Sequence, residues 1–415
     1  MTISRSDAEA RDREDELAPF RERFVLGDGE RIYADGNSLG RLPRATAARL
    51  EELVRAWGDR LVSGWQEWIE LPTRAGDGLG RLLGAHDGEV LVCDSTTVNL
   101  YKLAQAALDL RPGAIVTDAD NFPTDRYVLE GVAARGGGDL RLFKTDDVEG
   151  PTAGDVALVC ADGDVALVCL SHVAYRSGAL ANMGAITAAA RETGALVLWD
   201  LSHSAGSAPV ALDAAGAELA VGCTYKYLNA GPGAPAFLYV RRDLQPRLRS
   251  PIQGWFGQRD QFAMGPRYEP EDGVGRFHAG TPPILGLVSV QAGVELVLEA
   301  GIDGIRRKSE ALTELTIALV DERLAQLGFR VASPRDCELR GGHVALSHQE
   351  GWRICRALIE RAEVVPDFRP PDVVRLGFSP LYSRFVDVWD AIDRLGGLVE
   401  RGEYEDMDAA PLRVT

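Results

Sequence analysis

The stretch ALVLWDLSHSAG, residues 195–206, predicts a buried strand that ends on Asp200 and passes into a polar turn. Further along, CTYKYLNAGPG, residues 223–233, places Lys226 among small residues and glycines. A pyridoxal phosphate enzyme needs this pair, because the lysine forms a Schiff base with the cofactor aldehyde and the carboxylate keeps the pyridine nitrogen protonated. Taken singly, a lysine is typical of a solvated surface and a strand-end aspartate of a cap or turn. Together, in this order, they predict the cofactor.

Short apolar runs alternate with helical patterns through much of the chain. The predicted strands lie in VLVCDSTTVNLYKLAQAALDL (90–110), GAIVTD (113–118), VALVCLSH (165–172), ALVLWD (195–200) and LAVGCTY (219–225). This alternation predicts an α/β fold in which helices cover both faces of a mostly parallel sheet. Ligands bind at the carboxyl ends of the strands in such sheets, and the polar clusters described below follow those ends.

Composition limits the class of protein. The chain has 415 residues, of which 46% are hydrophobic and 26% charged, and no apolar run approaches the roughly 20 residues that span a bilayer. The N-terminus has dense charge where a signal peptide needs an apolar core, so we expect a cytoplasmic protein without membrane contact. A net charge of −17 argues against nucleic acid as a partner. Six cysteines without CxxC spacing predict reduced thiols, and six dispersed histidines predict no metal site.

The length predicts two lobes. We expect residues 1–45 to form an N-terminal segment that packs with the small domain, and residues 46–286 to form the large cofactor-binding domain. Residues 287–415 are expected to form a smaller α+β domain. Its predicted strands lie near FRVAS (329–333), HVALSH (343–348) and VVRLGF (373–378).

A direct tandem repeat interrupts the large domain. GDVALVCAD (154–162) is followed at once by GDVALVCLS (163–171), a period far too short for a solenoid. Only one copy can occupy the core strand that delivers Ser171. We assign that strand to the second copy and expect the first to form an extra edge strand or a loop.

Three polar clusters carry candidate cofactor chemistry. Ser95 to Thr97 precede a predicted helix whose free N–H groups favour a phosphate, with a plain capping segment as the alternative. In DNFPTDRY (120–127), Phe122 can stack on a flat ring and Asp125 can accept from a ring hydroxyl, unless the segment is an ordinary turn. His203 either binds the phosphate or is a satisfied polar residue near a helix start.

Arg375 lies in VVRLGF, a short apolar strand. An unpaired guanidinium would be costly to bury there, so a bidentate partner is expected. A substrate carboxylate and an intramolecular salt bridge both satisfy this requirement.

Motifs along most of the chain resemble those of the kynureninase family. They run in order from about residue 33 to 390: DGNSLG (35–40), STTVNL (95–100), NFPTDRY (121–127), LSHVAYRSG (170–178), WDLSHSAG (199–206), CTYKYLNAGPG (223–233), QGWFG (253–257), GTPPIL (280–285) and VVRLGFSPLY (373–382). The resemblance implies the fold type I aminotransferase architecture, with a seven-stranded type of sheet, and a homodimer. It also implies hydrolysis of L-kynurenine to anthranilate and L-alanine in tryptophan catabolism, with 3-hydroxykynurenine as a further candidate substrate.

The resemblance also implies roles for matching residues. Lys226 resembles the Schiff-base lysine that then removes the α-proton, Tyr225 a proton donor or relay, and Asp200 the partner of the pyridine nitrogen. Further cofactor contacts are implied for Thr96, Thr97, Phe122, Asp125, Ser171 and His203. Trp255 and Thr281 resemble residues that reach the phosphate from the partner subunit. Arg375 resembles the clamp for the substrate carboxylate, and Ser38 a second substrate contact.

Two departures bear on substrate preference: Ala174 stands where the family usually has asparagine, and LGFSPLYSRF (376–385) differs from the usual run after the clamp arginine. Other fold type I enzymes, such as a cysteine desulfurase-like lyase or an aminotransferase, are the nearest alternatives. A desulfurase needs a mobile cysteine, for which Cys337 is the one candidate in a late loop. A cofactor-fold protein without turnover would need none of Lys226, Asp200 and Arg375.

Overall fold

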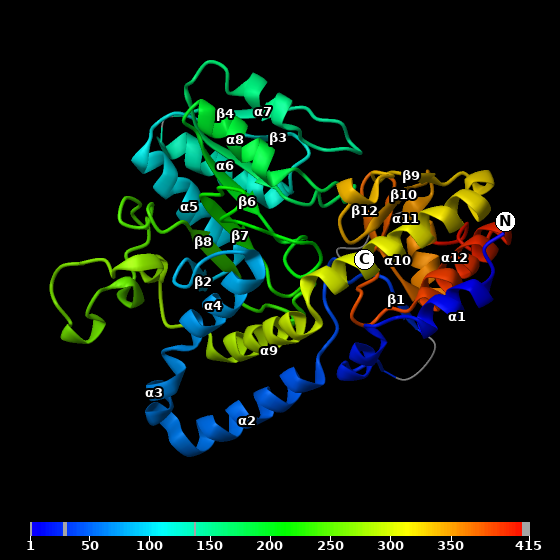
Figure 1. The fold of residues 1–415 in the computed structure, drawn as a ribbon, viewed down its shortest axis with the longest axis horizontal. Helices are drawn as coiled ribbons and strands as arrows, with labels where there is room; N and C mark the ends of the chain where they lie inside the picture. The colour runs from blue at the N-terminus through cyan, green and yellow to red at the C-terminus, as the bar shows by residue number, and fades with distance from the viewer. Residues whose placement is uncertain (1, 28–30, 137, 409–415) are drawn as a thin grey trace.

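The computed structural model describes residues 2–27, 31–136 and 138–408. Two lobes lie side by side, and both ends of the described chain lie at the smaller one (Figure 1). Parts of the predicted first and last segments, residues 1, 28–30 and 409–415, lie outside this description, so the predicted extents of those segments are not addressed there.

A mostly parallel sheet forms the centre of the large lobe. Its strands are β2 (Val90–Val92), β3 (Ala114–Asp118), β4 (Leu140–Phe143), β5 (Val165–Ser171), β6 (Leu196–Asp200), β7 (Leu219–Gly222) and β8 (Phe237–Val240). Within the described residues it has seven strands, in the order β2-β8-β7-β6-β5-β3-β4. Strands β7, β6, β5, β3 and β4 run parallel, whereas β8 is antiparallel to both neighbours. The predicted mostly parallel α/β fold is confirmed.

Helices complete both lobes. Their bounds are α1 (Arg5–Arg13), α2 (Arg44–Arg60), α3 (Trp65–Trp68), α4 (Leu71–Leu83), α5 (Thr96–Leu110), α6 (Pro123–Gly136), α7 (Ala153–Val159), α8 (Met183–Glu192), α9 (Ile284–Ala300), α10 (Ile302–Arg323), α11 (Gly351–Arg361) and α12 (Phe385–Glu400). Short 3₁₀ helices are η1 (Ala18–Arg23), η2 (Leu61–Gly64), η3 (Trp255–Gly257), η4 (Gln261–Ala263), η5 (Gly273–Phe277), η6 (Ala325–Leu327) and η7 (Cys337–Leu339).

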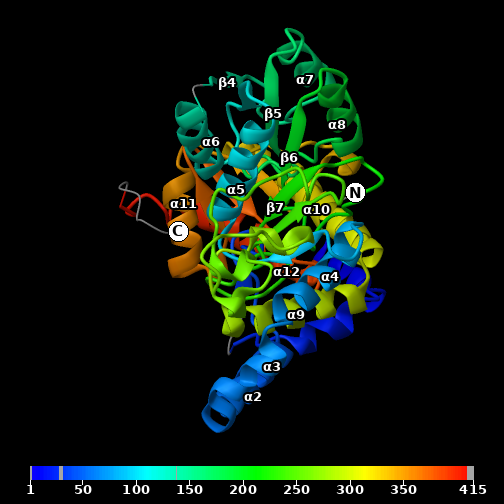
Figure 2. The same ribbon diagram turned by 90° about the vertical axis from the view of Figure 1, so that its left-hand side faces the viewer.

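Both faces of the large sheet are buried, as continuous apolar strands require. In β6, Val197 and Trp199 point into the core shared with α4, α8 and α9, whereas Leu198 points into the core shared with α5 and α6. This alternation is the two-residue period of a strand. Figure 2 shows the sheet between these helices. The strands are thus fixed from both sides, and their ends have defined positions.

The small lobe is built on an antiparallel sheet. Its strands are β9 (Arg330–Val331), β10 (Val344–Ser347), β12 (Asp367–Arg369) and β13 (Val373–Leu376). Among the described residues their order is β12-β13-β10-β9, and α10, α11 and α12 pack against this sheet or one another. Near the N-terminus, β1 (Ile32–Tyr33) pairs in parallel with β11 (Val364–Val365), while α1 packs on α12.

The junction between the lobes runs through α9 and α10. Helix α9 packs against α4 and α2 of the large lobe, and α10 continues to the small-lobe sheet. The division at residues 286–287 remains a prediction. Within the described residues no single helix is long and apolar enough to cross a membrane; α9 and α10 meet that length and composition together but are bent by 80°.

The two copies of the tandem repeat fold differently. The second copy forms β5, as predicted, but the first forms helix α7, so the expectation of an edge strand or loop was wrong. Thr152 caps α7 in a capping box with Asp155. Val156 and Cys160, one helical turn apart, then reach the core, whereas every residue from Val165 to Leu170 is buried in β5.

Leu158 and Leu167 occupy the same place in the two copies and test this difference directly. Leu158 is 80% exposed on α7 and Leu167 is fully buried in β5. We expect Leu167→Ala to destabilise the protein by about 2–5 kcal/mol through the cavity it leaves, and Leu158→Ala by less than about 0.5 kcal/mol. Urea unfolding of both variants measures this, and equal losses would contradict the assignment of helix and strand.

Candidate active site

The carboxyl ends of β5, β6 and β7 meet at one edge of the large sheet. Ser171 at the end of β5 is paired in register with Asp200 at the end of β6. Strand β7 lies beside β6 and ends four residues before Lys226. Parallel pairing therefore brings together three of the residues that the sequence predicted to act together.

The Lys226 amine is buried without a carboxylate partner among the described residues. Its Nζ is 3.2 Å from Nε2 and 3.4 Å from Nδ1 of His203, and 5.9 Å from the centre of the Phe122 ring. Burial lowers the pKa of Lys226. Burial, together with the charge of Lys226, holds the pKa of His203 well below its usual value. A neutral amine, able to act as a nucleophile or base, is favoured here.

Two buried carboxyl groups face each other near the amine. Asp200 Oδ1 accepts from the Ser202 N–H at 2.7 Å, and Asp125 lies beside Asp200. Burial raises the pKa of Asp125, and the Asp200 charge raises it further. Asp125 Oδ2 is buried without a hydrogen-bond partner in the described part of the chain. Such a pair is costly unless a cation or polar ligand joins it.

Neighbouring side chains fix the positions of Ser171 and Phe122. Ser171 Oγ donates to Asn121 Oδ1 at 2.7 Å. The Phe122 ring contacts Tyr175 edge to face, with ring centres 5.3 Å apart. Tyr225, beside Lys226, has its pKa raised by the neighbouring Cys223 and by burial, so its hydroxyl keeps its proton.

Thr96 and Thr97 begin α5, where Ser95 caps the helix by accepting from the Val98 N–H. Thr96 is half-buried and Thr97 exposed, so their hydroxyls and N–H groups are accessible. The preceding Asp94 is held by the fully buried Lys102, whose Nζ donates to Asp94 Oδ2 and to the Phe277 carbonyl, each at 2.7 Å. This helix start is a suitable site for a phosphate.

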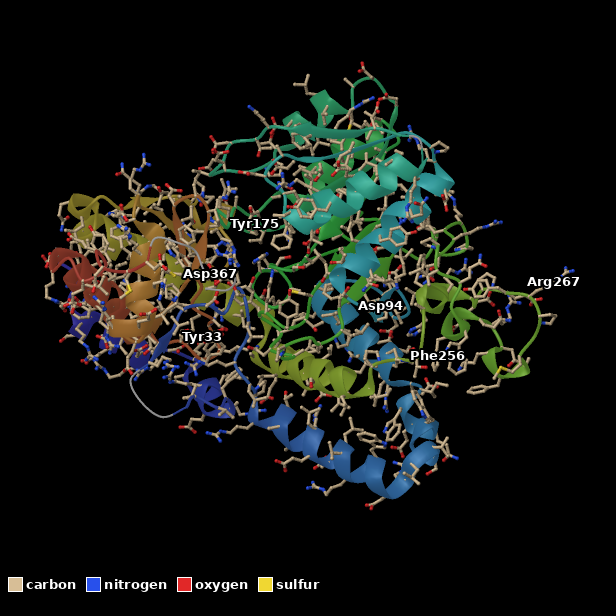
Figure 3. The ribbon with its side chains drawn as sticks, turned by 180° about the vertical axis from the view of Figure 1, so that it is seen from behind. Tyr33, Asp94, Tyr175, Phe256, Arg267 and Asp367 are labelled. Atoms are coloured by element: carbon tan, nitrogen blue, oxygen red, sulfur yellow. The ribbon has the colours of Figure 1, made fainter. Side chains whose placement is uncertain are left out.

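Arg375 forms an intramolecular salt bridge, which is one of the two interactions that the sequence predicted for it. Its Nε donates to Asp367 Oδ1 at 2.6 Å, and its Nη2 to Asp367 Oδ2. Ser38 Oγ accepts from Nη2 at 3.2 Å and donates to Asp367 Oδ2 at 2.8 Å. Figure 3 shows Asp367 near Tyr175, at the junction of the lobes. Arg375 and Ser38 are therefore brought together.

Trp255 and Thr281 are not brought into this cluster within one chain. Trp255 is 44% exposed, and its ring contacts are to Phe256 and Phe262. Figure 3 shows Phe256 well separated from Tyr175, which packs on Phe122. Thr281 is exposed. Both residues thus lie on the surface of the large lobe.

Comparison with known proteins gives the family. A family model described as the kynureninase C-terminal domain matches residues 305–395. A kynureninase from Pseudomonas fluorescens is 44% identical over 409 residues, which cover 96% of each chain. This chain belongs to the kynureninase family. A kynureninase from Burkholderia pseudomallei is 44% identical over 406 residues, again with 96% of each chain covered.

Solved structures outside the kynureninase family share the fold. A cysteine desulfurase from Thermococcus onnurineus superposes with a TM-score of 0.80 at 20% identity, covering 92% of this chain and 98% of that one. A desulfurase from Escherichia coli gives 0.79 at 18% identity, covering 93% and 99%. The expected fold type I architecture is confirmed, and at this identity the likeness concerns the fold alone.

Several residues at the site of this kynureninase family member were missed from the sequence. Asp367 and Arg369 alternate on β12, beside Arg375 on β13, so the two-residue period would have signalled them. His343 precedes β10; burial lowers its pKa to about 3, and neither ring nitrogen has a hydrogen-bond partner among the described residues. Its ring centre lies 5.9 Å from that of His203. No local signal marks His343, because its neighbours come from the other lobe.

Asp35 lies beside the salt bridge between Arg375 and Asp367, and its pKa predicts how stability depends on pH. Burial and the Asp367 charge raise its pKa to about 7, against a model-peptide value of 3.8 when unfolded. The folded protein therefore holds a proton that the unfolded chain releases, and the free energy of unfolding falls as pH rises from about 4 to 7. The Asp35→Asn substitution removes this fall in the free energy of unfolding. The stability of the variant relative to wild type should rise by up to about 2–3 kcal/mol between pH 5 and pH 8.

Thermal unfolding of both proteins at the two pH values measures this. The pH 5 comparison is the internal control for any packing effect of the amide. The same difference in Tm at both pH values would contradict the raised pKa.

Proposed function

We propose that this chain is a pyridoxal phosphate-dependent kynureninase that hydrolyses L-kynurenine to anthranilate and L-alanine. The observation that carries the proposal is the edge formed by β5, β6 and β7, where an amine without a carboxylate partner in the described chain faces a buried pair of carboxyl groups. The 44% identity to kynureninases over 96% of the chain supports the same reaction.

The side chains at this edge fit the cofactor. The unpartnered Asp125 Oδ2 and the Asp200 carboxylate suit the ring hydroxyl and the protonated ring nitrogen, and the start of α5 suits the phosphate. When bound, pyridoxal phosphate supplies an electron sink for a carbanion at the substrate Cα. The residues that would hold it are Thr96, Thr97, Phe122, Asp125, Ser171, Asp200, His203, Tyr225 and Lys226.

Lys226 and Tyr225 have separate roles in proton transfer. Burial favours the neutral Lys226 amine, so Nζ can take up the proton from Cα of the substrate. Tyr225 keeps its proton because its pKa is raised, so its hydroxyl can donate that proton to Cβ when the Cβ–Cγ bond breaks, while water supplies the hydroxyl group to Cγ. His203, held neutral beside Nζ, does not compete for positive charge with the lysine.

The alternative of a desulfurase has no comparable support. The thiol pKa of its candidate nucleophile, Cys337, is raised by burial rather than lowered. The other cysteines in the described chain are buried. Structural likeness to desulfurases at 20% identity reflects the fold alone. Kynurenine and 3-hydroxykynurenine both remain candidate substrates, and a cytoplasmic role in tryptophan catabolism remains a prediction.

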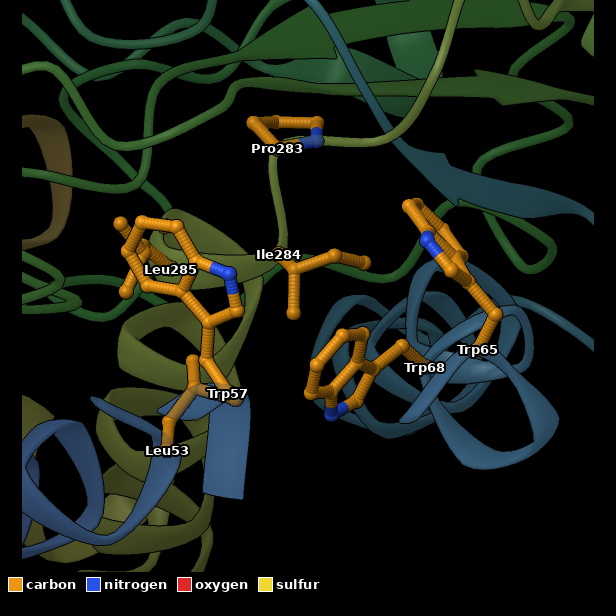
Figure 4. Close-up of a pocket in the computed structure, with 8 residues that line it drawn as sticks. Leu53, Trp57, Trp65, Trp68, Pro283, Ile284 and Leu285 are labelled. Carbon is orange, nitrogen blue, oxygen red and sulfur yellow. The ribbon is translucent and has the colours of Figure 1, made fainter. Parts of the chain in front are cut away.

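An exposed apolar face supports a homodimer with shared sites. Leu53, Trp57, Trp65 and Trp68 line a pocket of about 370 Å³ with residues 283–286. Figure 4 shows Ile284 between Trp57 on one side and Trp65 and Trp68 on the other. Thr281 precedes residues 283–286 of this pocket in the sequence. Trp255 contacts Phe256, which in turn packs on Trp65 of the pocket. Apolar patches of this kind mark association surfaces, so Trp255 and Thr281 would reach the site of a partner subunit.

Anthranilate release tests the function. We expect protein loaded with cofactor to release fluorescent anthranilate from L-kynurenine, and Lys226→Ala to reduce the rate by at least about 10³-fold because both attachment and proton transfer are lost. The assay is run with 3-hydroxykynurenine in parallel. Turnover near the wild-type rate in Lys226→Ala, or no product from either substrate in the wild type, would refute the proposal.

Hybrid dimers test the shared site. A dimer of one Lys226→Ala and one Trp255→Ala subunit, co-expressed with different tags and purified through both, has one site with both residues intact if Trp255 acts across the interface. We then expect about half of the wild-type activity per dimer, above that of either variant alone. Activity no higher than the mean of the two variant homodimers would place Trp255 in its own subunit's site or outside any site.

A further inference from the structure

Lys102, on α5, is a cation in an apolar environment. Its side chain is fully buried, and Leu100, Leu103 and Ala106 of the same helix belong to the surrounding apolar core. Burial of an ammonium group is costly unless its N–H groups all have acceptors. A buried apolar side chain of similar volume often serves stability as well as a buried ion pair does. Folding alone therefore does not account for a lysine at this position.

The ammonium group of Lys102 joins two distant parts of the chain. Its Nζ donates to Asp94 Oδ2 at 2.7 Å, to the Phe277 carbonyl at 2.7 Å and to Cys93 Sγ at 3.4 Å. An ammonium group has three N–H donors, so none is left for a ligand. Lys102 thus connects the residues that follow β2 with the end of η5, and it does not itself bind a ligand.

The first of these two parts is the turn from β2 into α5. Asp94 has a φ of +49°, in the left-handed region that residues other than glycine rarely adopt. Ser95 then caps α5, whose first turn contains Thr96 and Thr97. These two residues would hold the cofactor phosphate through hydroxyl and N–H groups. The bond from Lys102 to the Asp94 side chain fixes the turn that positions them.

The second part is the segment that runs from Phe277 to Thr281. Phe277 ends η5 and is fully buried, so its carbonyl has a defined position for the bond from Lys102. His278 follows, and burial together with the charge of Lys102 lowers its pKa to about 4. This imidazole is therefore neutral beside the ammonium group. The chain then continues to Thr281, one of the two residues proposed to reach the site of the partner subunit.

The loop that carries Trp255 packs on this same segment. Gly254 lies against the backbone of Ala279, so closely that a Cβ on Gly254 would overlap the Ala279 carbonyl. The Phe256 ring lies 6.2 Å from the His278 ring, measured between ring centres. Trp255 is bounded by these two contacts on either side in the sequence. The bond from Lys102 to Phe277 thus anchors a unit that includes both residues proposed to act in the partner's site.

We propose that Lys102 is a positioning residue that holds two phosphate-binding elements at once: the start of α5 in its own site, and the segment with Trp255 and Thr281 that serves the site of the partner subunit. The proposal rests on the proposed homodimer with shared sites. Each lysine then determines how tightly both sites of the dimer hold the cofactor phosphate.

Two forms of the cofactor separate this role from a general structural one. Full-length protein freed of cofactor is titrated with pyridoxal phosphate and with pyridoxal, which lacks the phosphate. Binding is followed by the change in cofactor absorbance, with Lys226→Ala as the blank. In Lys102→Met we expect the dissociation constant for pyridoxal phosphate to rise about tenfold to a hundredfold, because hydrogen bonds to a charged phosphate are weakened, and that for pyridoxal by less than about threefold.

Asp94→Asn is the conservative variant. The amide keeps an acceptor for Lys102 and tolerates the positive φ, so we expect a smaller loss that is again selective for pyridoxal phosphate. If Lys102→Met does not fold, Asp94→Asn carries the same comparison.

Lys308→Met is the matched control. Lys308 is 7% exposed, and its Nζ lies 2.6 Å from Asp15 Oδ2, so it is also a buried lysine paired with an aspartate. This pair joins α10 to the N-terminal segment and not to a cofactor-binding element. We expect Lys308→Met to lower the Tm, because the pair is broken, but to leave both dissociation constants within about twofold of the wild type.

Hybrid dimers test the reach into the partner's site. One subunit keeps Lys226 and the other carries Lys226→Ala, so that one site alone gives the absorbance signal. Lys102→Met is placed on either subunit in turn. We expect the dissociation constant for pyridoxal phosphate to rise at least about threefold with either placement, because one disturbs the start of α5 and the other the partner's segment. Trp255→Ala on the Lys226→Ala subunit is the positive control for a shared site.

Equal losses for pyridoxal phosphate and pyridoxal in Lys102→Met, or unchanged binding of pyridoxal phosphate, would overturn the proposal. An effect from only one of the two placements would overturn it as well. If Trp255→Ala acts from the partner and Lys102→Met does not, the shared site stands and the role of Lys102 fails. These titrations contain no kynurenine, so their outcome is independent of whether the protein releases anthranilate.

Discussion

Parallel pairing of β5, β6 and β7 is the constraint on which the site depends. Each strand is buried on both faces, so neither its register nor its direction can shift without exposing apolar side chains to water. Ser171 and Asp200 therefore stand opposite each other in register, and the chain leaving β7 carries Lys226 to the same edge. Burial of apolar side chains stabilises the fold that holds these polar groups in position, because the polar groups themselves contribute little to stability.

The electrostatics of this edge are those of a site built for a ligand. Burial shifts the pKa of both Lys226 and Asp125 toward the neutral form, and Asp125 Oδ2 has no hydrogen-bond partner in the described chain. A protein that used these residues only for folding would do better with apolar side chains of similar size. A bound cofactor would complete this polar network.

The small lobe contributes through a second constraint, the pairing of Asp367 with Arg375 across β12 and β13. This pair, with Ser38 from the N-terminal segment, joins two distant parts of the sequence at the junction of the lobes. Arg375 is thereby held in place by its own chain at this junction.

Much of the protein could be predicted from the sequence because the relevant signals are local. Continuous apolar runs, the turns that follow them, and the order of Asp200 and Lys226 depend on neighbouring residues, and they predicted the parallel sheet and the residues at its edge. The tandem repeat shows the limit of prediction from local sequence. The same residues GDVALVC form helix α7 in one copy and strand β5 in the next. The capping box and an exposed face select the helix, whereas pairing with β3 and β6 selects the strand.

The sequence by itself thus determined the class of fold, the family and the polar residues that follow the strand ends. Tertiary structure alone decided which repeat copy joins the sheet, that Asp367 pairs with Arg375, and that Trp255 lies away from the Lys226 cluster of its own chain. The physical reason is the same in each case. These outcomes depend on contacts between residues far apart in the chain, and neither period nor spacing in a single sequence records those contacts.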